Sequence, residues 1–111
     1  MNFFSLLKRK ILYKLKKKIN IDIDYINNKP LDDLLQYYGS DKANVFNQLN
    51  KKGHGFSSFY TRHLENLRTK KINILEVGSF AGASAAAFTK YFPHSNVYCF
   101  DVNISKFIYM S

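Results

Sequence analysis

The chain has 111 residues, which allows one small domain, and its hydrophobic content of 46% is ordinary for a globular protein. Its single cysteine, Cys99, excludes an internal disulfide and is expected to be a packing residue in a strand. No apolar run approaches the roughly 20 residues of a membrane span, and we expect a cytoplasmic protein, whether free or peripheral at the inner membrane surface.

The formal net charge of +9 is concentrated at the amino terminus. Residues 1–20 carry seven basic side chains and no acid, whereas the other 91 residues carry ten basic and eight acidic ones. The body of the chain is therefore only mildly basic, which argues against nucleic acid as a partner of the whole protein.

Residues 3–19 are expected to form a basic amphipathic helix, because apolar residues recur there at three- and four-residue steps. These residues are Phe4, Leu7, Ile11, Leu15 and Ile19. Lys8 and Lys18 fall in the same arc, where their stems can lie along an apolar surface with the ammonium groups in water. Four roles stay open for this segment: a helix on an anionic membrane surface, a helix packed on the domain or on a partner, an RNA-contacting tail, and a targeting peptide.

Residues 21–70 are expected to form a helical segment that precedes the main domain. Alternation over residues 21–25 predicts a short extended stretch or a linker. Pro30 suits the first position of a helix that reaches Tyr38, and Gly39 suits the position after its end. A polar loop follows, and then a helix over residues 57–67 with Ser57 as its N-cap.

Residues 72–101 have the pattern strand, glycine turn, helix, strand, which predicts an α/β fold. The apolar run from Ile72 to Val77 predicts a strand buried on both faces. Ser84 to Tyr91 is rich in alanine and predicts a helix that Pro93 ends. Residues 97–100 form a second apolar strand.

The acids and glycines of this unit have the spacing of a nucleoside-binding site. Glu76 lies near the end of the first strand, Gly78 and Gly82 shape a turn at a helix amino terminus, and Asp101 closes the second strand. An acid at that point can accept hydrogen bonds from ribose hydroxyls. The dinucleotide pattern Gly-x-Gly-x-x-Gly is broken by Phe80, which favours S-adenosylmethionine over NAD. The alternative is an ordinary ligand-free turn.

The sequence around the turn resembles motif I of class I S-adenosylmethionine-dependent methyltransferases, Glu/Asp-x-Gly-x-Gly-x-Gly. Glu76, Gly78 and Gly82 match it, and Phe80 replaces the middle glycine. An aromatic residue here, followed by Gly-x-Ser, resembles catechol-type O-methyltransferases and those that act on sugars and macrolides.

The resemblance implies a role for each residue of the turn. The backbone from Gly78 to Gly82, with Ser79 and Phe80, would approach the methionine part of the cofactor. Ser84 would bind the carboxylate of that part, and Asp101 the ribose. Glu76 would orient the turn or bind the ammonium group.

A second resemblance lies upstream. Residues 39–42, Gly-Ser-Asp-Lys, resemble a segment that precedes motif I in methyltransferases of bacterial glycan and macrolide gene clusters, although Ala43 replaces a common glycine. The resemblance spans residues 31–107 and implies O-methylation of a sugar or a glycosylated natural product. Asp41, Lys42 and Tyr60 could form a lid. His54 is the candidate general base; its alternative is an inert place in a flexible loop. No metal site is predicted.

The family has about seven strands, whereas this chain supplies two. The resemblance therefore implies an incomplete Rossmann-like domain over residues 71–111, behind the segments 1–20 and 21–70. We expect such an amino-terminal fragment to bind cofactor weakly, to be inactive alone, and to have a complementing carboxyl-terminal fragment as a partner. The alternative from a different class is a small basic protein without enzymatic activity that associates with membranes or nucleic acid through residues 1–20.

Overall fold

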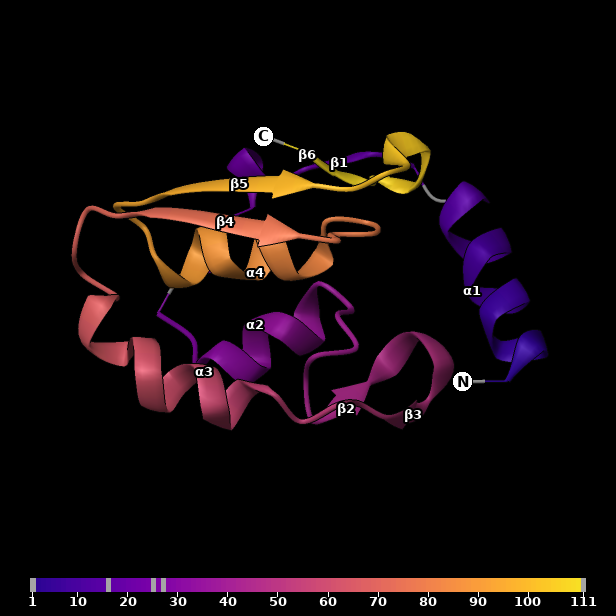
Figure 1. The fold of residues 1–111 in the computed structure, drawn as a ribbon, viewed down its shortest axis with the longest axis horizontal. Helices are drawn as coiled ribbons and strands as arrows, with labels where there is room; N and C mark the ends of the chain where they lie inside the picture. Colours follow the sequence, from indigo (N-terminus) through magenta and orange to yellow (C-terminus); the bar gives the residue numbers. More distant parts are fainter. Residues whose placement is uncertain (1, 16, 25, 27, 111) are drawn as a thin grey trace.

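The computed structural model describes residues 2–15, 17–24, 26 and 28–110, and it confirms an α/β arrangement (Figure 1). The α-helices are α1 (Phe3–Leu15), α2 (Leu31–Tyr37), α3 (Ser57–Leu64) and α4 (Ala83–Tyr91). The strands are β1 (Ile19–Asn20), β2 (Val45–Phe46), β3 (Lys51–Lys52), β4 (Asn73–Val77), β5 (Asn96–Phe100) and β6 (Tyr109–Met110). Short 3₁₀ turns are η1 (Ile21–Ile23), η2 (Asn47–Leu49), η3 (Glu65–Leu67) and η4 (Ile104–Lys106).

The predicted strand–helix–strand unit is confirmed. β4 and β5 are parallel and in register from the pair Asn73–Asn96 to the pair Val77–Phe100, so both strands end at one edge. α4 connects them and begins directly after Gly82, whose φ of 80° makes the sharp entry to the helix. This edge is where the residues of the predicted cofactor site lie.

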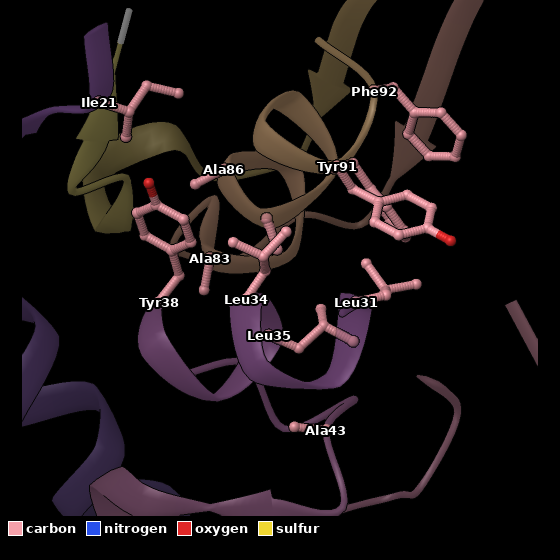
Figure 2. Packing of buried hydrophobic residues seen from close by; sticks show 12 residues of the cluster. Ile21, Leu31, Leu34, Leu35, Tyr38, Ala43, Ala83, Ala86, Tyr91 and Phe92 are labelled. Carbon is pink, nitrogen blue, oxygen red and sulfur yellow. The ribbon is translucent and has the colours of Figure 1, made fainter. Parts of the chain in front are cut away.

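The core lies between α2 and α4, and α4 in turn lies against the β4–β5 pair (Figure 1). The small side chains of Ala83, Ala86 and Ala87 let the two helices approach closely, and the leucines of α2 fill the space (Figure 2). Leu34 and Leu35 are completely buried. Burial of one such leucine contributes about 1.5–3 kcal/mol.

The prediction that the first strand is buried on both faces is wrong. Ile74 packs against the core, but Leu75 and Val77 on the other face are 59% and 79% exposed. The reason is that α4 covers only one face of the pair. Cys99 is partly buried, and burial raises the pKa of its thiol, which agrees with the packing role expected of it.

The amino-terminal helix ends at Leu15, earlier than predicted. Ile19 has left the helix and pairs in parallel with Tyr109, and its N–H donates to the carbonyl of Ile108 at 2.6 Å. Local periodicity cannot reveal such pairing with a distant segment. The stretch that follows is the 3₁₀ turn η1 and is not extended; Tyr25 lies outside the described residues. Within the described ranges, no helix combines the length and apolarity needed to cross a bilayer.

The middle segment follows the prediction with local corrections. Pro30 is the N-cap of α2, so the helix begins at Leu31, one residue later than expected. Gly39 follows the helix with a φ of 74°, as predicted. Ser57 is not the N-cap of α3. Its buried hydroxyl instead donates to Asp32 Oδ1 at 2.6 Å. The predicted polar loop contains a short antiparallel hairpin, β2–β3, which its polar composition concealed.

Candidate functional site

The turn from β4 to α4 is built on left-handed backbone positions. The φ angle is 83° at Gly78, 51° at Phe80 and 80° at Gly82. The Glu-x-Gly-x-Gly-x-Gly pattern has glycine at these three positions. Phe80 replaces the middle glycine, yet the backbone there is left-handed as well. The N–H of Gly78 donates to the carbonyl of Phe100 at 2.7 Å, which ties the turn to β5. A Cβ atom at Gly78 would meet no described heavy atom within 4 Å, so the turn is open there.

Phe80 is held in a conformation that costs a non-glycine residue about 1–2 kcal/mol. Its N–H donates to Asp101 Oδ2 at 2.7 Å. Its ring centroid lies 4.6 Å from the guanidinium carbon of Arg9 and 4.9 Å from Lys106 Nζ. Cation–π contacts of this kind contribute about 0.5–1 kcal/mol each at exposed sites. The aromatic ring therefore gathers two cations at the turn, which a glycine could not do.

Glu76, Ser84 and Lys42 form a polar cluster beneath the turn. The hydroxyl of Ser84 donates to Glu76 Oε1, and Lys42 Nζ lies 3.1 Å from Ser84 Oγ and 3.4 Å from Glu76 Oε1. The side chain of Glu76 is 9% exposed, and its Oε2 is buried without a hydrogen-bond partner among the described residues. An unpaired buried carboxylate oxygen is costly, so Oε2 is the atom of this cluster whose burial the described contacts leave uncompensated.

Helix α1 closes one side of the site through Arg9. Arg9 Nη1 lies 2.8 Å from Asp41 Oδ2, and the two side chains are 13% and 21% exposed. His54 Nε2 lies 3.7 Å from the same oxygen, and its ring stacks on Phe56. The side chain of His54 is 55% exposed, so the candidate base stands at the margin of the site.

Asp101 lies at the carboxyl end of β5, as predicted. Its Oδ1 accepts the N–H of Asn103 at 3.0 Å, and its Oδ2 accepts the N–H of Phe80. These backbone hydrogen bonds hold the pKa of the Asp101 carboxyl below its usual value of 3.8, so the group is ionised at neutral pH. Each carboxylate oxygen keeps further acceptor capacity, which ribose hydroxyls could use.

Two hollows meet at Gly78. The first, of about 210 Å³, is lined by Arg9, Asp41, Lys42, Ser79, Phe80 and Ser84, among others. The second, of about 330 Å³, is lined by Val77, Gly78, Phe100, Asp101 and Val102. Together they suit an elongated ligand that passes the bare backbone at Gly78. A larger hollow of about 690 Å³ between α2 and α3 shares no lining residue with the turn.

The structure gathers most of the predicted site residues at this edge. Ser79, Phe80 and Ser84 line the first hollow, and Asp101 lines the second. Gly82 instead faces the packed interior, where a Cβ atom would lie 3.1 Å from a ring carbon of Phe107.

Of the expected lid residues, Asp41 and Lys42 line the first hollow, whereas the ring of Tyr60 packs on Phe88. His63 packs on Phe59, and His94 is exposed.

Arg9 lines the first hollow, but the sequence did not reveal this role, because Arg9 is one of seven basic residues in the first 20. One signal was present: it is the only arginine among the seven cations of residues 1–20. A planar guanidinium can stack on a ring and pair with a carboxylate at once, which a lysine does less well.

Among the residues that the structure describes, no three histidine, cysteine, aspartate or glutamate side chains gather to hold a metal ion. Comparisons with models of protein families, with curated proteins and with solved structures find no match for this chain.

Proposed function

We propose that the chain binds S-adenosylmethionine at the 78–82 turn, as the cofactor-binding region of a Rossmann-like methyltransferase. The observation that carries this proposal is the left-handed backbone at Gly78, Phe80 and Gly82, set between Glu76 and Asp101 at the ends of two parallel strands. Ligands of open α/β sheets bind outside these carboxyl ends. The β4–α4–β5 unit would then be the first unit of a cofactor-binding sheet.

Lys42 and Ser84 line the first hollow, and Glu76, which both of them contact, lines a neighbouring hollow of about 520 Å³. Together these three side chains offer a partner for each charge of an amino-acid group. The unpartnered Oε2 of Glu76 would accept hydrogen bonds from the ammonium of the methionine moiety. Lys42 Nζ, which lies 3.1 Å from Ser84 Oγ, would donate to the carboxylate. The hydroxyl of Ser84 would donate to it as well after rotating away from Glu76 Oε1. Charge-assisted hydrogen bonds of this kind are about twice as strong as neutral ones.

The second hollow suits a nucleoside. Its walls are the exposed side chains of Val77, Phe100 and Val102, and its one ionised group is Asp101. The apolar side chains would contact the base, and the Asp101 carboxylate would accept hydrogen bonds from the ribose hydroxyls.

The proposed reaction is O-methylation of a sugar or a glycosylated natural product, supported by the resemblance of residues 39–42 to the glycan and macrolide enzymes. When bound, S-adenosylmethionine supplies an electrophilic methyl group. The chain would hold this group in place and orient it. His54, 3.7 Å from Asp41 Oδ2, would take the proton of an acceptor hydroxyl bound at the margin of the first hollow.

Calorimetry with S-adenosylhomocysteine tests the cofactor site. We expect saturable binding that Glu76→Gln and Asp101→Ala each weaken about tenfold to a hundredfold. The first removes the negative charge opposite the ammonium, and the second removes the acceptors of the ribose hydroxyls. Asp33→Asn is the matched control, because Asp33 is an exposed acid of α2. Circular dichroism shows whether each variant is folded. Unchanged binding by folded Glu76→Gln would refute the methionine subsite, and tighter binding of NAD would refute the choice of cofactor.

A further inference from the structure

Helix α1 is attached to the rest of the chain by its polar side. Ser5 and Arg9 lie one turn apart and face the protein: Ser5 Oγ accepts a hydrogen bond from Lys51 Nζ, and Arg9 pairs with Asp41. The helix also lies against η4. Figure 1 shows α1 at the right edge of the molecule, apart from the core between α2 and α4.

The apolar side of α1 faces outward. Phe4, Leu7, Ile11 and Leu15 form a continuous stripe and are between 43% and 81% exposed. They border a shallow hollow of about 480 Å³. A buried packing helix would have the opposite orientation, with this stripe toward the core.

Cations flank the stripe. With about 3.6 residues per turn, Lys8 and Lys10 fall on opposite sides of it, and both are exposed. Lys17 and Lys18 follow the helix and are exposed as well. Residues 1–20 contain no acid, and the nearest paired acid, Asp41, binds Arg9 on the inner side. The outer surface of α1 is therefore apolar at its centre and positive at its margins.

We propose that α1 binds the surface of an anionic lipid bilayer. The helix lies in the plane of the membrane, with Phe4, Leu7, Ile11 and Leu15 among the acyl chains and the flanking lysines at the headgroups. Lipid fits better than RNA, because RNA would neutralise the lysines and leave the apolar stripe in water. The inference is independent of the proposed cofactor site.

Sedimentation of the full chain with vesicles tests this inference. Wild-type protein binds vesicles that contain phosphatidylglycerol, binds pure phosphatidylcholine far less, and is partly released by salt. Replacement of both Lys8 and Lys10 by Gln weakens binding about thirtyfold, as expected for two cations at the surface. The matched control replaces Lys70 and Lys71, two exposed lysines before β4, and leaves binding nearly unchanged.

The apolar contribution is tested by Ile11→Ser combined with Leu15→Ser, which weakens vesicle binding at least about tenfold. Phe59→Ser, at an exposed apolar residue of α3, is the control. Circular dichroism establishes that the variants are folded. Equal vesicle binding by the Ile11/Leu15 variant overturns the proposal, and so does salt-sensitive binding to single-stranded RNA without binding to anionic vesicles.

Discussion

Helices α1 and α2 have similar apolar periodicity but opposite surroundings. α2 has seven residues, and its leucines are buried against α4 (Figure 2). α1 has 13 residues, yet its apolar stripe faces outward, and its polar side is attached through Ser5 and Arg9. The hydrophobic period thus shows which side of a helix is apolar but does not show what that side contacts.

The difference also has an energetic meaning. A seven-residue helix is far too short to be stable alone, so α2 exists because its leucines are buried. α1 adds little buried apolar area and is held by a few polar contacts. The stability of the fold is therefore expected to depend on α2, and α1 is expected to open at a lower free energy.

The largest expected effect on the free energy of unfolding comes from shortening an apolar side chain of α2, compared with one of α1. Leu34→Ala should lower the free energy of unfolding by about 2–5 kcal/mol, because it leaves a cavity in the core. Ile11→Ala should change it by less than about 0.5 kcal/mol, because Ile11 is half exposed. Urea denaturation measures both. Equal losses would mean that the stripe of α1 is buried in solution.

The polar start of α2 should come next. Asp32 accepts hydrogen bonds from Ser57, from the backbone of Asn44 and from Gln36. Asp32→Asn should cost about 2 kcal/mol, whereas the exposed neighbour changed in Asp33→Asn should cost a few tenths at most. Denaturation at neutral pH compares the two, and similar losses would count against this network.

The loss of stability caused by Asp32→Asn should depend on pH. Burial acts to raise the pKa of Asp32, but the hydrogen bonds from Ser57, Asn44 and Gln36 outweigh it and hold the pKa below its usual value of 3.8. A carboxyl whose pKa is lower in the folded than in the unfolded state contributes its full stabilisation above the unfolded pKa. This stabilisation is lost as the pH falls through the folded pKa. The difference between wild type and Asp32→Asn should therefore shrink in acid below pH 3.8; a constant difference would contradict the ionised state.

Removing the attachment of α1 should have a smaller and more local effect. Arg9→Ala should cost about 1.5 kcal/mol, at the low end for a hydrogen bond to a charged group. Amide hydrogen exchange should accelerate along α1 and stay slow in α2. Lys10→Ala, at an exposed lysine, is the control. Faster exchange in both helices would show that α1 and α2 open as one unit.

The smallest expected difference is between two glycine variants, one at the end of α2 and one before α3. Gly39 and Gly55 have φ angles of 74° and 68°, so alanine is strained by about 1–2 kcal/mol at either position. A Cβ atom at Gly39 would also lie 2.2 Å from Gln48 Nε2 and displace that side chain, whereas at Gly55 it would meet Asn44 Oδ1 at 3.4 Å. Thermal denaturation should show a slightly larger loss for Gly39→Ala than for Gly55→Ala; the reverse order would contradict the placement of Gln48.

The features that the sequence predicted correctly have local causes. Gly82 and Pro93 delimit α4. Glu76, Ser84 and Asp101, which their spacing singled out, lie around one edge of the β4–β5 pair. Cofactor binding itself stays a prediction.

The features that sequence reasoning missed depend on distant partners. Ile19 joins Tyr109 in a strand pair, and the hydroxyl of Ser57 reaches Asp32 instead of capping its own helix. Arg9 turns inward because Asp41 and Phe80 are there to receive it. Such contacts depend on the assembled fold, and hydrophobic periodicity does not encode them.

Arg9 belongs both to α1 and to the wall of the first hollow, and this has a thermodynamic consequence. A ligand in the hollow and a surface against α1 would act on the same ion pair with Asp41. If a bound ligand changes the affinity of α1 for the surface by some factor, linkage requires that the surface change the affinity for the ligand by the same factor. Ligand binding and surface binding would then be coupled through the guanidinium group of Arg9. Vesicle binding measured with and without S-adenosylhomocysteine would give the size of this coupling.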